Sequence, residues 1–275
     1  MHRIWTQHEI ETLTDLYHLR MTKELTDVLP GRTLNSIFQK ARSLNLKANR
    51  KLTRKQYLVD YSYFSVPKLE NSYWAGFIAA DGNIGESKDR VRIKLLASDS
   101  HHLEAFRNDS GSNNPIIDVY NGLKKYVSLE ICGVPRWKTD LQKNFCITPR
   151  KSLTLQPPKH LSKEHSLAFI TGYIDGDGCI FMEKPPTGHL RIGVQVTGTH
   201  EVLCWVKSWF DKIAPSEYQA SARCIGNIYS YKIVGKKAES ILRVLFQTAT
   251  PKLERKWAKV STFFVERAHR RCTIS

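Results

Sequence analysis

The sequence has no apolar run long enough to span a membrane, and its start, Met1-His2-Arg3, does not look like a secretory signal peptide. We therefore expect no membrane partner. We expect a place in the cytoplasm of a bacterial or phage-infected cell, at the nucleoid, with an organelle matrix as the alternative. Acidic residues are scarce: 26 Asp and Glu stand against 42 Lys and Arg, a formal net charge of +16. This imbalance favours a polyanionic partner, nucleic acid first, over a basic surface without a specific partner.

The cysteines lack the spacing that would hold a zinc ion. No two of the six have the separation of a zinc finger or zinc ribbon, which excludes a small zinc domain. We predict reduced thiols, most of them buried. The 275 residues allow a sizeable core and two or three structural units. The cysteines are Cys132, Cys146, Cys179, Cys204, Cys224 and Cys272.

A repeated stretch organises the chain. Residues 72–84 (SYWAGFIAADGNI) and 168–180 (AFITGYIDGDGCI) align without gaps on their Asp-Gly pairs. Each copy predicts a short helix that ends at its glycine, the usual residue just beyond a helix end. If the two helices pack against each other, Asp81 and Asp177 come out side by side at the helix ends.

Small residues on one face of each predicted helix favour such packing. Gly76 and Ala80 are four residues apart, as are Gly172 and Gly176, so each pair shares a helical face. Small side chains let two helix backbones approach closely. The alternative is a pair of unrelated core helices that both happen to end in Asp-Gly, and the presence of two matched copies in one chain argues against it.

Two neighbouring carboxylates at helix C-termini are electrostatically unfavourable. Each faces the negative end of a helix dipole, and the two repel each other. A divalent cation would offset both effects, and carboxylate oxygens with backbone carbonyls and water suit Mg²⁺. We predict a Mg²⁺ site made by Asp81 and Asp177 with the backbone of Ala80 and Gly176, in which Mn²⁺ or Ca²⁺ can substitute for binding.

The paired motif resembles the signature of the LAGLIDADG homing endonucleases, in the single-chain form with two motifs. The resemblance implies an α+β fold with two pseudo-symmetric αββαββα halves that form a DNA-binding saddle. It also implies a monomer that cuts one phosphodiester in each strand of a long, non-palindromic duplex and leaves short 3′ overhangs. The motif copies differ at one acidic position, where Ala79 stands opposite Asp175; the family places the metal role on the last acidic residue, so we expect an intact site.

The resemblance also implies a basic residue in each half near the scissile phosphate. Lys151 and Lys256 follow their aspartates at similar distances, each near a Thr-Pro pair, with Arg150 and Arg255 as competitors. Gln195 resembles the polar residue that the family places near the metal and water. We align Leu96 with Gln195 in the first half, so the two halves are chemically unequal.

The N-terminal 46 residues predict three helices. The pattern Trp5-Thr6, Gly31-Arg32-Thr33, Ser36-Ile37, Lys40-Ala41 and Leu44 resembles Myb/SANT-like helix-turn-helix domains, whose third helix enters the major groove. A helical protein-interaction domain is the alternative. The predicted outward residues of the third helix are Arg32, Asn35, Gln39, Lys40 and Arg42.

Two alternating segments predict antiparallel sheets with one apolar and one polar face. In residues 90–95 (RVRIKL) the basic side chains share one face, and residues 190–197 repeat the alternation. The apolar face covers helices, and the polar face can meet DNA. The predicted DNA-binding residues of the linker and sheets are Arg50, Lys51, Arg54, Arg90, Arg92, Lys94, Lys124, Lys125, Arg191, Thr197, Arg223 and Lys232.

The predicted organisation has five parts. Residues 1–46 form the helix-turn-helix domain, 47–70 a basic linker and lead-in, 71–155 the first half, 156–165 a connector and 166–275 the second half. The sequence favours a site-specific, metal-dependent endodeoxyribonuclease. The alternative is a protein of the same fold that binds nucleic acid without cutting it, as an intron RNA maturase or a DNA-binding regulator.

Overall fold

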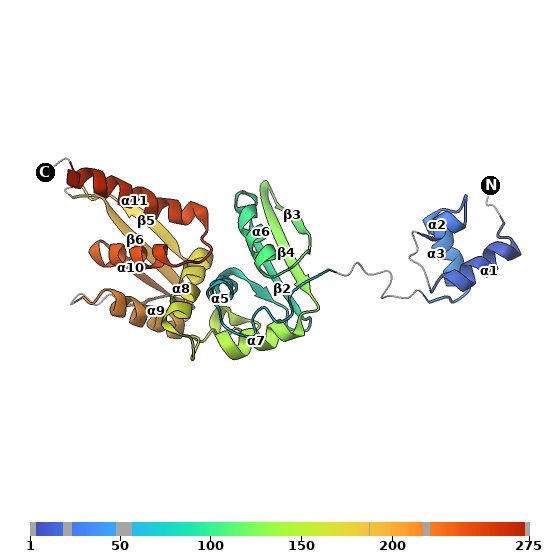
Figure 1. Cartoon of the computed structure of the whole chain (residues 1–275), viewed down its shortest axis with the longest axis horizontal. Helices are drawn as coiled ribbons and strands as arrows, with labels where there is room; N and C mark the ends of the chain where they lie inside the picture. Colours follow the sequence, from blue (N-terminus) through green and yellow to red (C-terminus); the bar gives the residue numbers. More distant parts are fainter. Residues whose placement is uncertain (1–3, 19–23, 48–56, 187, 217–220, 273–275) are drawn as a thin grey trace. The chain divides into compact units, whose positions relative to one another are not determined.

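The structure, a computed structural model, describes residues 4–18, 24–47, 57–186, 188–216 and 221–272. The chain divides into two compact units, Met1–Tyr57 and Leu58–Ser275 (Figure 1). No helix within those ranges is both long and apolar enough to cross a membrane. The predicted linker residues Arg50, Lys51 and Arg54 lie outside the described residues.

The first unit contains three helices, α1 (Gln7–Leu16), α2 (Leu25–Val28) and α3 (Leu34–Ser43). Thr6 and Glu9 form the predicted capping box at the start of α1, and Thr33 caps α3. The unit has its own small core, separate from that of the rest of the chain. This core consists of Leu13, Tyr17, Leu25, Leu29, Ile37 and Ala41.

Arg32 corrects one prediction, because it does not point outward. Its side chain is only 7% exposed, its Nη2 lies 2.7 Å from Glu9 Oε2, and its guanidinium stacks 4.3 Å from the centre of the Trp5 ring. Arg32 chiefly lowers the pKa of Glu9, to about 2, by donating hydrogen bonds to its carboxylate. Arg32 therefore fixes the start of α1 to the turn before α3. Asn35, Gln39 and Arg42 are exposed on α3, and Lys40 is partly exposed.

The second unit contains two copies of one topology, which confirms the predicted α+β fold. The first copy runs α5 (Leu69–Asp81), β1 (Asn83–Ile84), β2 (Arg90–Leu96), α6 (Ser100–Asp109), β3 (Ile116–Asn121), β4 (Lys124–Cys132) and α7 (Pro135–Phe145). The second runs α8 (Lys163–Asp177), β5 (Cys179–Glu183), β6 (Arg191–Gly198), α9 (His200–Ile213), β7 (Arg223–Ile225), β8 (Ile228–Val234) and α10 (Lys236–Gln247). A long helix, α11 (Glu254–Cys272), follows the second copy. Short 3-10 turns, η1 (Ala97–Asp99) and η2 (Lys151–Leu153), occur in the first copy.

The two sheets are antiparallel and share one strand order. It is β1-β2-β4-β3 in the first copy and β5-β6-β8-β7 in the second. The hairpins close at Gly122 and Gly226, whose φ angles of +59° and +62° lie in the left-handed region that favours glycine. Period-two burial along β2 and β6 turns their apolar residues toward the helices, as the alternation predicts.

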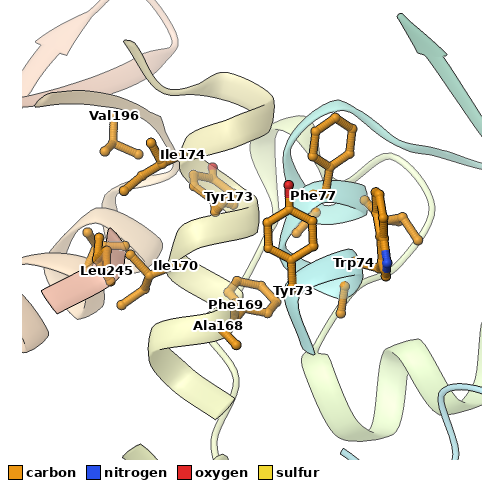
Figure 2. Close-up of a cluster of buried hydrophobic side chains, with 14 of the residues drawn as sticks. Tyr73, Trp74, Phe77, Ala168, Phe169, Ile170, Tyr173, Ile174, Val196 and Leu245 are labelled. Atoms are coloured by element: carbon orange, nitrogen blue, oxygen red, sulfur yellow. The ribbon is translucent and has the colours of Figure 1, made fainter. Parts of the chain in front are cut away.

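The helices α5 and α8 pack against each other at the centre of the unit, with one sheet on either side (Figure 1). A Cβ atom at Gly76 would lie 1.9 Å from the backbone oxygen of Phe169, and one at Gly172 would lie 1.9 Å from that of Tyr73. In Figure 2, Tyr73 of α5 lies beside Phe169 and Tyr173 of α8. The two backbones therefore touch, and one hydrophobic core extends through both halves.

The cysteines correct a second prediction. Cys132, Cys179, Cys204 and Cys224 are exposed, and Cys146 is partly buried. The strand cysteines lie at outward positions of the sheets, where the pleat turns alternate side chains to solvent. Their placement follows from strand register, which the scattered spacing of the residues did not reveal.

Candidate active site

The site forms where α5 and α8 end. Asp81 is the last residue of α5 and Asp177 the last of α8, and Gly82 and Gly178 follow them in extended conformation. A Cβ atom at Gly176 would meet Ala80 Cβ at 2.4 Å and Asp81 N at 3.2 Å. The final turns of the two helices are therefore in contact, and the structure brings the two carboxylates together.

The surroundings hold both carboxylates closer to protonation than usual. Desolvation, followed by the charge of Asp177, raises the pKa of Asp81 from 3.8 to about 6. Desolvation also raises the pKa of Asp177, while Lys151 and Lys256 oppose the increase. A cation placed between the two side chains would relieve their mutual repulsion.

Two buried lysines flank the carboxylates. Lys151 is 7% exposed and donates a hydrogen bond from Nζ to Ala80 O at 2.9 Å. Lys256 is 6% exposed, and its Nζ lies 2.6–3.2 Å from the backbone oxygens of Ile174, Asp175, Gly176 and Gly178. Each lysine therefore places its charge on the negative end of one motif helix.

Burial lowers the pKa of both lysines. Desolvation is the largest cause for each, and it brings the pKa of Lys256 down to about 8. The aspartates act in the opposite direction and favour the charged lysines. The buried lysines and the two exposed aspartate side chains therefore stabilise one another's ionised forms. Arg255 instead turns to Asp99, 2.8 Å away, and Arg150 to Glu86, 2.7 Å away.

The donor set suits a cation that keeps much of its own water. Within the described ranges, no three His, Cys, Asp or Glu side chains cluster as a complete metal site. The carbonyls of Ala80 and Gly176 already accept hydrogen bonds from Lys151 and Lys256. A carbonyl oxygen has two lone pairs, so the candidate protein ligands are still the Asp81 and Asp177 carboxylates with the backbone oxygens of Ala80 and Gly176. Mg²⁺ is commonly held by one or two carboxylates, with water and phosphate oxygens completing its shell, so these residues fit it.

Strand register corrects the predicted equivalent of Gln195. Cys179, two residues after Asp177, pairs with Gln195 across β5 and β6. Asn83, two residues after Asp81, pairs with Arg92 across β1 and β2. Arg92, and not Leu96, therefore occupies the place of Gln195 in the first half. The loops before β2 and β6 differ in length, and the sequence alignment of the two strands missed the resulting difference in register.

These two equivalent positions differ in charge and in contacts. Gln195 is partly buried and donates a hydrogen bond from Nε2 to Ser230 Oγ at 2.9 Å. Arg92 is exposed, with Asn83 and Glu130 as its cross-strand neighbours. An exposed cation thus stands beside one motif and a hydrogen-bonded amide beside the other.

The predicted basic sheet residues lie mostly on the solvent faces. Register places Arg90, Arg92, Lys94 and Lys124 on one face of the first sheet. It places Arg191, Gln195, Thr197, Arg223 and Lys232 on one face of the second. Lys125 is the exception: it lies opposite Tyr120 on the other face and pairs with Asp118 at 2.9 Å. Thr197 also reaches the site, donating a hydrogen bond from Oγ1 to Asp177 O at 3.2 Å.

A buried polar network beside the site was not predicted. Asp175 is 1% exposed, and its carboxylate accepts hydrogen bonds from Tyr73 Oη (2.7 Å), Leu253 N (2.8 Å) and Trp257 Nε1 (2.7 Å). Burial is the main reason why its pKa rises to about 6. His102 Nε2 lies 2.9 Å from Tyr73 Oη, and burial lowers the pKa of His102 to about 3.

One sequence signal could have revealed this network. The gapless alignment of the motifs places Tyr73 over Phe169 and Ala79 over Asp175. The second copy thus has a carboxylate where the first has alanine. The first copy has a phenol hydroxyl where the second has phenylalanine, and this hydroxyl can donate a hydrogen bond to the carboxylate. Because buried polar groups need hydrogen-bond partners, a polar departure in each copy of an apolar repeat predicts a hydrogen bond between the copies.

The fold and the site together define a two-repeat α+β protein with paired carboxylates at a helix junction. Its chain is similar to the solved structures of the I-LtrWI LAGLIDADG homing endonuclease bound to target DNA and of meganuclease I-SmaMI bound to uncleavable DNA. The first has 11% identity, a TM-score of 0.48 and coverage of 76% of this chain and 92% of the other. The second has 12% identity, a TM-score of 0.49 and coverage of 74% and 93%. The LAGLIDADG meganuclease I-AabMI, bound to uncleaved DNA, is similar at 11% identity, a TM-score of 0.48 and coverage of 73% and 93%. No protein-family model and no curated protein matches the sequence.

Proposed function

We propose that this protein is a site-specific, double-strand DNA endonuclease that hydrolyses one phosphodiester in each strand and leaves short 3′ overhangs. The observation that carries the proposal is the junction of α5 and α8. There the close approach at Gly76 and Gly172 brings Asp81 and Asp177 together between two buried lysines. A protein that only bound a polyanion would gain nothing from two adjacent carboxylates on the side it offers to phosphate.

The residues of the junction supply the electrostatics that phosphodiester hydrolysis needs. Mg²⁺, when held by Asp81 and Asp177, supplies charge stabilisation and an acidified water. Lys151 and Lys256 stay buried against the helix ends and favour the ionised form of the two aspartates. Arg92 and Gln195 lie on the polar sheet faces beside the two motifs and can orient a phosphate or a water by hydrogen bonds. Holding these groups in place before substrate arrives avoids the cost of reorganising them during the reaction.

Double-stranded DNA is the partner that the sheet surfaces fit. Each sheet carries a row of basic side chains on its solvent face, and arginine and lysine pair well with guanine edges in the major groove. The two rows differ in sequence, which suits a long, non-palindromic target read by a monomer. The second candidate is a non-cleaving nucleic-acid-binding protein, such as an intron RNA maturase or a DNA-binding regulator, because the same basic faces would serve it.

Incubation with a duplex library decides between these two functions. We expect the full chain with Mg²⁺ to break a randomised duplex library at one recurring sequence, with short 3′ ends when the fragments are sequenced. The same protein with EDTA should bind the selected duplex and leave it intact. Folded protein that binds DNA tightly and produces no recurring break contradicts the endonuclease proposal and favours the binding protein.

We also propose that the N-terminal unit is a second DNA-binding module that adds affinity and target selection. Its exposed α3 carries Asn35, Gln39 and Arg42, and its core is separate from that of the second unit. Deleting residues 1–57 should therefore weaken binding to the selected target by about 10²-fold, the usual scale for losing a tethered module. The rate of cutting on saturated DNA should stay the same in a single-turnover assay. A large loss of that rate contradicts the modular role.

A further inference from the structure

The two candidate lysines are held in very different ways, although they occupy matching places. Among the described residues, Lys151 Nζ donates to one backbone oxygen, Ala80 O at 2.9 Å. Lys256 Nζ has four backbone oxygens within 3.2 Å, three of them from residues 174–176 at the end of α8. The segment that carries Lys256 is also held at two further points by one side chain, that of Asp175.

Asp175 clamps the first turn of α11 from both sides of Lys256. Its Oδ2 accepts from Leu253 N, three residues before the lysine, and its Oδ1 accepts from Trp257 Nε1, one residue after it. The Asp175 backbone oxygen accepts from Lys256 Nζ itself at 2.7 Å. One residue of α8 therefore fixes the position of the turn and the reach of the ammonium.

Residues of the first half hold the Asp175 carboxylate in place across the interface between α5 and α8. Tyr73 of α5 donates its hydroxyl hydrogen to Asp175 Oδ2 at 2.7 Å. Because that hydrogen is used, His102 Nε2, 2.9 Å from the same hydroxyl oxygen, must be the donor to Tyr73. Arg255, next to Lys256, also pairs with Asp99 of the first half at 2.8 Å. The lysine segment of the second half is thus anchored to both halves.

The positions that correspond to this network under the repeat are apolar. The motif alignment puts Ala79 at the position of Asp175 and Phe169 at that of Tyr73. Trp205 packs edge-on against Phe169 with 5.7 Å between ring centres, as His102 packs against Tyr73 at 5.8 Å. The hydrogen-bonded series His102, Tyr73 and Asp175 therefore corresponds, under the repeat, to the apolar series Trp205, Phe169 and Ala79.

We propose that Asp175, held by Tyr73, is a positioning residue for Lys256 alone, so that the strand served by the second half depends on this network and the other strand does not. The inference rests on the proposed endonuclease function. It adds that one half of the site has a supporting network that the other half lacks. Asp175 touches no reacting atom. It acts by keeping the ammonium of Lys256 at the end of α8, beside Asp177. Misplacing a supporting group by about 1 Å can cost up to ~10²-fold in rate.

The test measures the cutting of each strand separately. The duplex selected from the library carries a different label on each strand, and nicking rates are taken under single-turnover conditions with saturating protein. Lys256→Met and Lys151→Met identify the strand that depends on each lysine. Asp175→Asn should slow the Lys256-dependent strand about tenfold or more. It should leave the other strand unchanged, so nicked duplex accumulates.

Tyr73→Phe is the milder variant, and it tests the same inference if Asp175→Asn does not fold. It removes one hydroxyl and leaves the other two hydrogen bonds of Asp175, so we expect a several-fold loss on the same strand. In the Lys256→Met background it should cause no further loss, because residues that act as one unit are not additive. Tyr231→Phe is the matched control: it removes another buried phenol hydroxyl, one with no hydrogen-bond partner among the described residues, and should change neither strand.

Four outcomes overturn the inference. Equal slowing of both strands by Asp175→Asn and Tyr73→Phe would show a general loss of structure. Folded variants that cut both strands at the wild-type rate would show that Lys256 needs no such support. Lys256→Met slowing both strands alike would remove the half-specific role. Wild-type protein that cuts neither strand overturns the proposed function and this inference with it, so the two failures are distinguishable.

Discussion

Asp81→Asn and Asp177→Asn should each abolish cleavage while sparing DNA binding. The change keeps the size of the side chain and removes one of the two carboxylates that can hold the cation. Loss of metal-assisted charge stabilisation is worth several kcal/mol, so the single-turnover rate should fall by on the order of 10³-fold or more. Affinity measured with EDTA should hold or improve slightly, because one negative charge facing phosphate is lost.

The pKa of Asp81 supplies an independent readout for the same variant. Its folded pKa of about 6 lies above the ordinary 3.8, so the folded state binds more protons than the unfolded state between those values. The stability contributed by protonated Asp81 is full below 3.8 and is lost as the pH rises through 6. At about pH 7 Asp81→Asn should therefore melt at a higher temperature than the wild type, with the gap closing toward about pH 4.

The control for this pair of measurements is Glu201→Gln. Glu201 is an exposed carboxylate in the first turn of α9, outside both motif helices. Its amide variant should cut both strands at the wild-type rate. An Asp81→Asn or Asp177→Asn protein that still cuts both strands normally would eliminate these residues as the metal-binding pair.

The largest structural effect is expected from Gly172→Ala. The added Cβ would lie 1.9 Å from Tyr73 O and 2.9 Å from Phe77 N, both backbone atoms that no side-chain rotation can move away. In an isolated helix alanine is favoured over glycine by about 1 kcal/mol, but forcing two packed elements apart costs roughly 1–3 kcal/mol or more. A contact of 1.9 Å with a backbone atom puts this cost at or above the top of that range, so we expect a net loss of ~2 kcal/mol or more in the free energy of unfolding, with cleavage lost as the helix ends separate.

Denaturant unfolding of the full chain measures this loss, and Gly133→Ala is its control. Gly133 has a φ angle of +75°, and apart from its two chain neighbours no described residue has an atom within 4 Å of an added Cβ. Its alanine variant should therefore lose only the cost of left-handed backbone, roughly 1–2 kcal/mol, and should keep its cleavage activity. Gly172→Ala with wild-type stability would mean that the helices do not touch at this residue in solution.

The residues of the repeat determine most of the fold by themselves. Small residues four apart, a terminal glycine and alternating strands predict a packed helix pair and antiparallel sheets with one apolar face, because period and side-chain size act locally. The same pattern predicts that Asp81 and Asp177 meet, since two helices packed on matching faces must end together. The charge of +16 favours a polyanion through composition alone.

The tertiary structure decided what depends on register and on distant partners. The loop before β2 sets Arg92 opposite Asn83, so the sequence alignment of the two strands gave Leu96 in error. Arg32 turns inward because Glu9 and Trp5 lie beside it only after the first unit folds. The hydrogen bonds of Asp175 to the turn of Lys256 join residues that are 78 and 82 positions apart. Local patterns fix helices, strands and their faces; hydrogen bonds between distant residues exist only in the folded chain, and there they make the two halves of the site unequal.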